Sequence, residues 1–248
     1  MRPVLLALVL AALPGCTDLG SKDLFHHPGA VPFTLAGGDP APDQSAVPVD
    51  QPVDVLLSDL PDPESVDRES FFITSGPLLF TGGYHVDLID RRLRFIPARE
   101  FPQHLGMRVH VTQKLRSLDG RALEDPASYG FMTGESPGGA PPPLPSITAI
   151  DLEPMFRDRC GGACHAGPGA ILGVDLGTAD ALRESLVAEP STQRPLLQRV
   201  AAGDHARSYL VRKLLGAPTI VGELMPPDAP LDAAELRQIA DWIDGGAQ

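Results

Sequence analysis

The stretch CGGACH at Cys160–His165 decides the character of the second half of this chain. Two cysteines followed directly by a histidine form the attachment motif of c-type haem, in which the thiols bond the haem vinyl groups and the adjacent imidazole meets the iron. The usual spacing has two residues between the cysteines, whereas this chain has three, all of them small. The motif predicts one covalently attached haem c at Cys160 and Cys164, with His165 as an iron ligand.

The segments around this motif show helical periodicity. Good N-cap residues precede apolar stripes, and glycine follows the last two of them. The predicted helices cover Ile150–Arg159, Thr178–Val187, a segment from Asp204 to Gly216, and a segment from Asp232 to Gly245. The second half is therefore predicted to be all-α.

A haem that only carries electrons needs a second axial ligand. Met225 is the best candidate, because Pro226 and Pro227 would stiffen the loop that presents it. It follows His165 by 60 residues, with two predicted helices between them. His205 is a reserve ligand, but beside a helix N-terminus it is predicted to be a surface residue. A core position for Met225 is the plainer alternative.

The first half of the chain is rich in short alternating strands. They are separated by turn signals, which favours an antiparallel sandwich. The predicted strands are 53–57, 71–74, 84–88, 93–96, 107–111 and 129–133. The histidines of this half, His85, His104 and His110, are predicted to be plain surface residues.

Two resemblances extend these patterns. The first half is similar to bacterial Ig-like domains of surface proteins in the motifs Val47–Asp50, Ser65–Asp67, Leu93–Pro97, Arg108–Val111, Asp119–Leu123 and Phe131–Thr133. The second half resembles class I cytochromes c, of the type found in planctomycete and myxobacterial proteins, in Ser208–Leu210, Met225–Pro227 and Ile239–Ile243. The second resemblance implies that His165 is the proximal and Met225 the distal iron ligand.

The N-terminus has the features of a secretory signal. Arg2 precedes an apolar run that is too short to span a bilayer, and a small residue precedes Cys16. Leu13-Pro14-Gly15-Cys16 resembles the lipobox of bacterial lipoproteins, which implies acylation of Cys16 and attachment to a membrane. An ordinary signal peptide that is cut nearby is the alternative. The expected location is extracytoplasmic, in the periplasm or at the cell surface.

The net charge and the Pro/Gly-rich segments indicate possible partners and domain boundaries. The formal net charge is -12, and loss of residues 1–15 removes only Arg2. This acidic balance argues against nucleic acid and anionic lipid as partners and allows basic partner proteins. The predicted division is a signal peptide (1–15), a lipid-anchored tether (16–30), an Ig-like sandwich (31–133), a Pro/Gly-rich linker (134–146) and a cytochrome c-like haem domain (147–248). We expect few contacts between the two domains.

Three functions from different classes are compatible with these features. The first is single-haem electron transfer to a redox partner protein, without enzyme activity, since no catalytic constellation is apparent. The second is a copper-binding lipoprotein that uses Cys160, Cys164 and His165, because soft thiolates with histidine suit copper. The third is a cofactor-free surface lipoprotein in which Cys160 and Cys164 form a disulfide.

Overall fold

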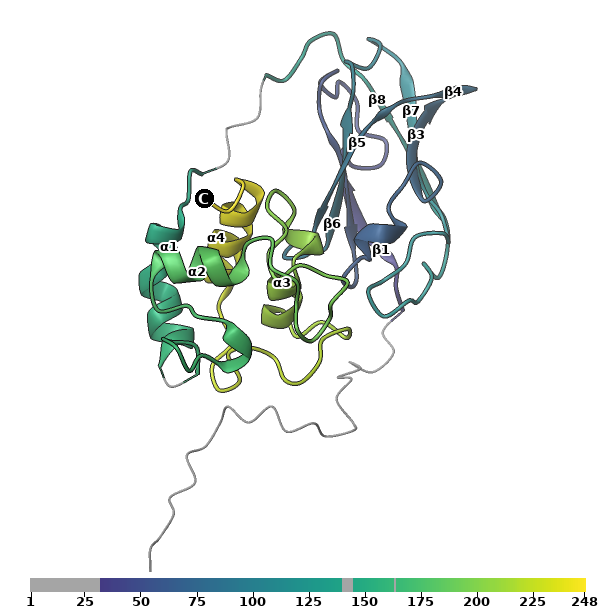
Figure 1. Cartoon of the computed structure of the whole chain (residues 1–248). Helices are drawn as coiled ribbons and strands as arrows, with labels where there is room; N and C mark the ends of the chain where they lie inside the picture. Colours follow the sequence, from purple (N-terminus) through teal and green to yellow (C-terminus); the bar gives the residue numbers. More distant parts are fainter. Residues whose placement is uncertain (1–31, 140–144, 163) are drawn as a thin grey trace, which may run out of the picture.

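The computed structural model describes residues 32–139, 145–162 and 164–248. Figure 1 shows a β-rich region in the first part of the chain and a helical region in the second part. The predicted signal peptide, most of the tether with Cys16, and residues 140–144 of the linker lie outside the described residues. The predicted fold class, an antiparallel β-sandwich followed by an all-α region, is confirmed.

The β-rich region consists of two four-stranded antiparallel sheets. The first has the order β1–β2–β6–β5, made of Leu35–Asp39, Val53–Leu57, Arg92–Pro97 and Gly82–Asp87. The second has the order β4–β3–β7–β8, made of Leu78–Leu79, Phe71–Ser75, Gly106–Val111 and Ala127–Met132. All six predicted strands are present, whereas β1 and β4 were not predicted.

Alternation along the strands explains why these segments pair into a sandwich. In β7, Met107, Val109 and Val111 are buried, while Arg108 is exposed and His110 half-buried between them. Successive side chains of a strand point to opposite faces, so one face of the sheet is apolar and faces the core. The inner faces of the two sheets bury Val53, Val55, Phe71, Ile73, Leu93, Phe95 and Phe131, each at most 3% exposed.

The helical region contains four α-helices. They are α1 (Ala149–Phe156), α2 (Ala179–Leu186), α3 (Tyr209–Leu214) and α4 (Ala233–Asp244). A π-helical turn, η2 (Arg157–Gly161), continues α1 into the cysteine motif. The predicted helix from Asp204 is divided: Asp204 caps only a short 3-10 turn, η4 (His205–Arg207), and α3 begins after Ser208.

Helix α4 anchors this region. Asp232 caps it by accepting hydrogen bonds from the backbone N–H groups of Ala234 and Glu235. Ile239, Trp242 and Ile243 form its fully buried stripe, which packs α4 against α1 and α3. The Trp242 indole N–H donates to the Gln248 carbonyl at 3.0 Å, so the last residue of the chain is also held.

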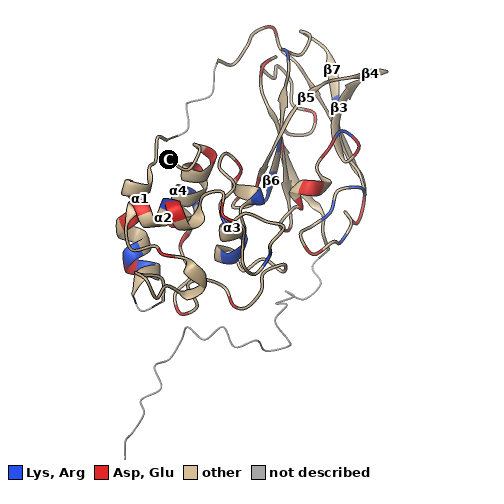
Figure 2. Cartoon of the chain, viewed as in Figure 1, with Lys and Arg blue, Asp and Glu red and all other residues tan. Residues whose placement is uncertain are grey.

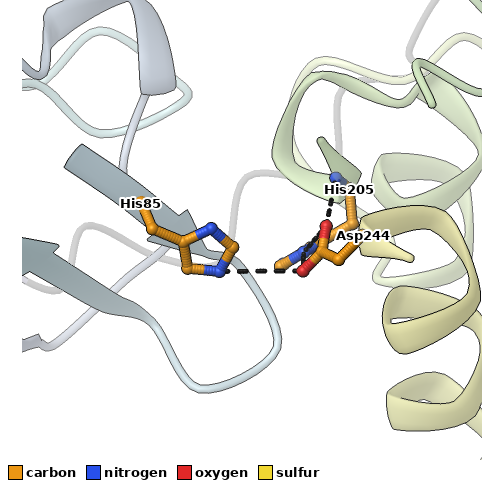
Figure 3. A group of neighbouring side chains, drawn as sticks. All are labelled: His85, His205 and Asp244. Atoms are coloured by element: carbon orange, nitrogen blue, oxygen red, sulfur yellow. Dashed lines mark hydrogen bonds and ion pairs between the residues drawn. The ribbon is translucent and has the colours of Figure 1, made fainter. Parts of the chain in front are cut away.

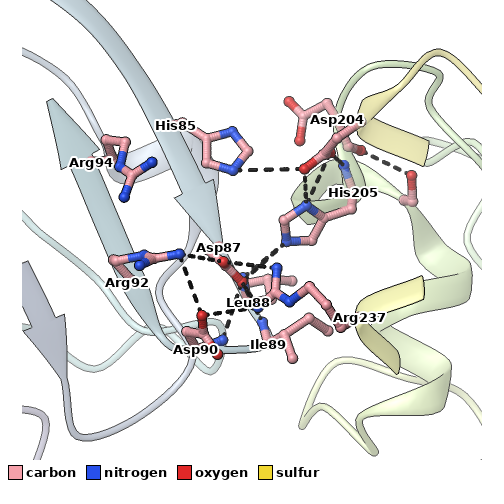
Figure 4. Close-up of polar contacts among 12 residues, drawn as sticks. His85, Asp87, Leu88, Ile89, Asp90, Arg92, Arg94, Asp204, His205 and Arg237 are labelled. Atoms are coloured by element: carbon pink, nitrogen blue, oxygen red, sulfur yellow. Dashed lines mark hydrogen bonds and ion pairs between the residues drawn. The ribbon is translucent and has the colours of Figure 1, made fainter. Parts of the chain in front are cut away.

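The expectation of few contacts between the two regions is wrong. Figure 4 shows a polar network where the end of β5 meets η4 and α4. Arg237 of α4 donates to Asp87 of β5 at 3.0 and 3.2 Å, and Asp87 is only 2% exposed. Arg207 of η4 also bonds Glu64 at 2.7 Å. Charged residues at the ends of elements carried no sequence signal that they would become buried partners.

Candidate functional site

The structure brings the four predicted site residues of the second half to one cavity. Cys160, Cys164, His165 and Met225 all line a cavity of about 550 Å³ within the helical region. The cysteine motif approaches it from the end of α1, and Met225 approaches it from the loop between α3 and α4. Cys16, the predicted lipidation site, lies outside the described residues.

His165 is held in the state that suits a metal ligand. Its Nδ1 lies 3.0 Å from the Val174 carbonyl oxygen, so Nδ1 carries the proton and donates it there. The ring nitrogen Nε2 therefore keeps its lone pair. Burial lowers the pKa of His165, and the positive charge of Lys213 lowers it further. A metal-bound histidine commonly has its second nitrogen fixed by a carbonyl in this way.

The two cysteines lie on either side of a turn at Gly162. Cys160 is the last residue but one of the π-helical turn, and Gly162 has a φ of +38°, a conformation that glycine adopts without strain. The Cys164 N–H donates a hydrogen bond to the Gly161 carbonyl at 3.2 Å. The additional residue in the motif is thus accommodated by a π turn and a glycine-rich bend.

The chemical state of Cys160 bears on the cofactor-free interpretation. Cys160 carries a free thiol whose pKa is raised to about 11, mainly by burial. Because Cys160 is free, the disulfide between Cys160 and Cys164 that the cofactor-free interpretation requires is not formed.

Met225 is half-buried and fastened to α3. Its backbone N–H donates to the Lys213 carbonyl at 3.2 Å. The Lys213 ammonium in turn donates to the Val221 carbonyl at 2.6 Å. The predicted methionine loop is therefore attached to the helix whose residues Leu210 and Leu214 line the same cavity.

The cavity is lined by apolar side chains and by polar side chains of both charges. The apolar part includes Phe156, Ile171, Leu172, Val174, Leu176, Leu186, Leu210 and Leu214. The polar part includes the cationic Arg159, Arg199 and Lys213, the acidic Glu223 and Asp228, and the neutral Ser191, Thr192, Gln193 and Tyr209. Most of these polar residues were missed by sequence reasoning, because they come from separate helices and loops and share no spacing.

Arg199 shows how the polar side is built. Its guanidinium donates to the Ser185 carbonyl at 2.6 Å, to the Leu172 carbonyl at 2.9 Å and to Thr192 Oγ1 at 3.2 Å. These contacts join α2, the 3-10 turn at Ile171–Gly173 and the loop at Thr192 at the cavity wall. They also fix a permanent positive charge at a site that is otherwise largely apolar.

A second cluster of possible metal ligands lies between the two regions. Donor atoms of His85, His205 and Asp244 lie within 4.8 Å of one another, as Figure 3 shows. His205 Nδ1 is 2.8 Å from Asp244, and Leu88 N–H donates to His205 Nε2 at 3.2 Å. Both nitrogens of His205 thus serve the interface, so we assign the cluster a structural role.

His205 is the main correction among the histidines. It was predicted to lie on the surface, but it is 0% exposed and packs between Asp87 and Asp244. Burial alone would lower its pKa, but the two carboxylates raise it to about 9. Asp87 Oδ1 lies 3.6 Å from Nε2, so this carboxylate is placed to balance the charge of the doubly protonated ring.

The pKa of Asp87 moves in the opposite direction. Burial alone would raise it, but hydrogen bonds from His205, from Arg237 and from the backbone N–H of Asp90 hold it well below its usual range. The group is therefore a buried, ionised carboxylate whose charge is balanced from both sides of the interface.

The other histidines of the sandwich have different surroundings. His104 is on the surface, as predicted. His85 is half-exposed, with Nε2 3.7 Å from the carboxylate of Asp244 in α4. His110 is half-buried and stacks on Phe72 with 4.7 Å between ring centroids. His85 and His110 are therefore not plain surface residues.

Charge is distributed over the whole molecule. Acidic and basic positions alternate over both regions in Figure 2 rather than gathering on one of them. Within the described residues, no helix combines the length and the apolar character that a membrane span requires.

Comparison with known proteins gives no family. No protein-family model matches the sequence, and no curated protein matches it either. Several solved structures resemble part of the chain. The surface-layer protein SbsC, domains 1–6, is 12% identical over 50% of this chain and 16% of its own, with a TM-score of 0.34.

Two further structures are described as an L,D-transpeptidase and as a copper resistance protein. L,D-transpeptidase 1 of Mycobacterium tuberculosis is 25% identical over 41% of this chain and 39% of its own, with a TM-score of 0.29. PcoC, a methionine-rich copper resistance protein from Escherichia coli, is 17% identical over 42% of this chain and 99% of its own, with a TM-score of 0.34. At such low TM-scores the likeness carries no inference about function.

Proposed function

We propose that the helical region binds one covalently attached haem c and that the protein is a membrane-anchored, extracytoplasmic electron carrier. The observation that carries this proposal is the single cavity that Cys160, Cys164, His165 and Met225 all line. His165 and Met225 are 60 residues apart in the chain, yet both line this cavity together with the two cysteines.

The cavity suits the group in size and in chemistry. Its volume of about 550 Å³ is in the range of small-molecule and cofactor sites. Apolar side chains such as Phe156 and Leu214 would contact the porphyrin faces. Arg199 and Lys213, on the polar side, would stabilise the negative charge of the propionates.

The chain's own residues have distinct roles in this proposal. When bound, the haem supplies one-electron oxidation and reduction. His165 presents a neutral imidazole, oriented by Val174, and Met225 presents a thioether that favours the reduced state relative to a second histidine. With His165 and Met225 both on the iron, no position would remain for a substrate, and we therefore propose an electron carrier rather than an enzyme.

The anchor and the partner complete the proposal. Acylation of Cys16 would hold the protein on a bacterial membrane, in the periplasm or at the cell surface. The formal net charge of -12 favours a redox partner protein with a basic docking surface. Replacement of Cys16 by serine should release the protein from the membrane fraction, and an unchanged fractionation would contradict the anchor.

Copper binding is the second candidate, because thiol, imidazole and thioether groups also suit copper. A single metal ion requires its ligand atoms to lie close together. Among the described residues, Cys160, Cys164 and His165 do not form such a compact group, whereas His85, His205 and Asp244 do. The spread of the predicted ligands around a large cavity favours haem over a lone ion.

An optical spectrum of the purified protein, produced with a cytochrome c maturation system, separates these candidates. A reduced low-spin haem spectrum supports the proposal, and absence of haem with bound copper contradicts it. Met225→Ala should lower the reduction potential and let carbon monoxide reach the iron. Met132→Ala, an exposed methionine of the sandwich, is the control and should change neither property.

A further inference from the structure

Arg159 connects the cysteine segment of the cavity lining with the loop that carries Met225. It belongs to the π-helical turn, directly before Cys160, and its side chain lines the cavity. Its Nη2 donates to the Pro230 carbonyl at 2.9 Å and to the Ala229 carbonyl at 3.3 Å. One guanidinium thus joins the cysteine segment to the end of the loop that carries Met225, which we call the methionine loop.

Glu235 extends this connection to α4. Its Oε2 lies 3.3 Å from Arg159 Nη2, and its Oε1 lies 3.3 Å from Nε. The same carboxylate accepts the Asp232 N–H at 2.8 Å, as part of the capping box of α4. The side chains of Arg159 and Glu235 are 33% and 24% exposed, so water screens the pair only in part.

The methionine loop is therefore held at both ends. At its start, the Lys213 ammonium donates to the Val221 carbonyl, and the Met225 N–H donates to the Lys213 carbonyl. At its end, Arg159 binds Ala229, Pro230 and Glu235. The start is attached to α3, whereas the end is attached to the segment that carries Cys160. The second attachment thus links the loop to the cysteine segment.

We propose that Arg159 is a positioning residue that sets the separation between the cysteine segment and the Met225 loop. The inference rests on the proposed haem function, since this separation would fix how firmly the Met225 sulfur is held at the iron. An arginine is suited to this task because its planar guanidinium faces the Glu235 carboxylate with both Nε and Nη2 while Nη2 also contacts the two carbonyls, whereas a lysine ammonium is a point charge.

Carbon monoxide binding to the reduced protein measures how often Met225 leaves the iron. In Arg159→Ala we expect binding about tenfold faster than in the wild type, equivalent to about 1.4 kcal/mol in the opening equilibrium. Arg159→Lys should resemble Arg159→Ala, since it keeps the charge but loses the fork. Glu235→Gln should produce a smaller increase. Equal rates in Arg159→Ala and wild type would overturn the proposal, as would wild-type behaviour of Arg159→Lys.

Arg157→Ala is the matched control. Arg157 is in the same π-helical turn, is 56% exposed and pairs with Glu153 and Asp158. Its variant should bind carbon monoxide within about twofold of the wild type, as for other surface changes. A comparable acceleration in this variant would mean that the turn as a whole is perturbed, which contradicts a specific role of Arg159.

Amide hydrogen exchange gives a readout that does not depend on haem chemistry. In Arg159→Ala, exchange in residues 221–229 should accelerate, whereas it should remain unchanged in the sandwich. Unchanged exchange in this loop would overturn the positioning role even if Arg159→Ala loads haem poorly. A wild-type protein without haem overturns the proposed function together with this inference, whereas haem-loaded variants that do not differ overturn the inference alone.

Discussion

The sandwich and the helical region solve the problem of burying apolar surface differently. In the sandwich, side chains from two sheets fill the space between them, and residues such as Phe71, Ile73 and Phe95 are fully buried. In the helical region, helices of six to twelve residues surround a cavity of about 550 Å³. Isolated helices of this length are marginal in water. The helical region also buries side chains such as Trp242 and Ile243, but it leaves this cavity among its helices, and in our proposal the cavity holds the cofactor.

The largest expected effect is loss of the cofactor. Combined Cys160→Ala and Cys164→Ala should abolish haem attachment, and the helical region should then lose its cooperative thermal transition. The sandwich should keep its own transition, because its core needs no haem. Calorimetry of the variant tests this difference, and it would be contradicted by a helical region that melts as in the haem-loaded protein.

The interface between the regions gives the next largest effect. Asp87→Ala leaves Arg237 and Arg92 without their buried partner, and breaking such a buried pair costs about 3–5 kcal/mol. Asp90 contacts the same two arginines but is 50% exposed, so Asp90→Ala should cost less than about 1 kcal/mol. Chemical denaturation of both variants measures the contrast, and equal losses would mean that Asp87 is not the central contact.

The pH dependence of this interface should be smaller. Because the folded-state pKa of His205 is raised from 6.5 to about 9, its contribution is fully present below pH 6.5 and is lost as the pH rises through about 9. The free energy of unfolding should fall by about 2–3 kcal/mol over this range. His205→Gln should flatten the decrease, whereas His104→Gln, at the surface, should not. A decrease that persists in His205→Gln would assign it to another group.

The smallest effect is expected at the rim of the interface. Arg207 and Glu64 form an ion pair across the two regions at 2.7 Å, but their side chains are 46% and 69% exposed. Arg207→Ala should therefore lower the free energy of unfolding by less than about 1 kcal/mol. Denaturation in low and high salt checks this, and a loss near that of Asp87→Ala would show that the rim contributes as much as the buried contact.

The same contrast explains what the sequence could predict. Strict alternation in Gly106–Val111 and apolar spacing in Ala233–Asp244 specify a strand and a helix directly. β1 was missed because Leu35–Asp39 contains two glycines and no alternation. The cysteine motif and the Pro-stiffened Met225 indicated one shared site by residue type. Sequence could not reveal the partners of His205, since burial of a charged group depends on what approaches it from elsewhere in the fold.

The cavity shows a further limit of sequence reasoning. Arg199 and Gln193 line it from loops without regular spacing. Arg159 has no distinguishing feature in the sequence, and its role follows only from carbonyl groups about 70 residues away. Such contacts depend on how the loops meet, which neither periodicity nor a motif encodes.

The central claim is that Cys160 and Cys164 attach haem within the cavity. Haem staining of the full chain after denaturing electrophoresis tests it most directly, after expression with a cytochrome c maturation system and with the Cys160→Ala, Cys164→Ala double variant alongside. We predict haem that stays with the wild-type polypeptide through denaturation and is absent from the double variant. Wild-type protein that carries no haem, or that releases it on denaturation, would contradict the account.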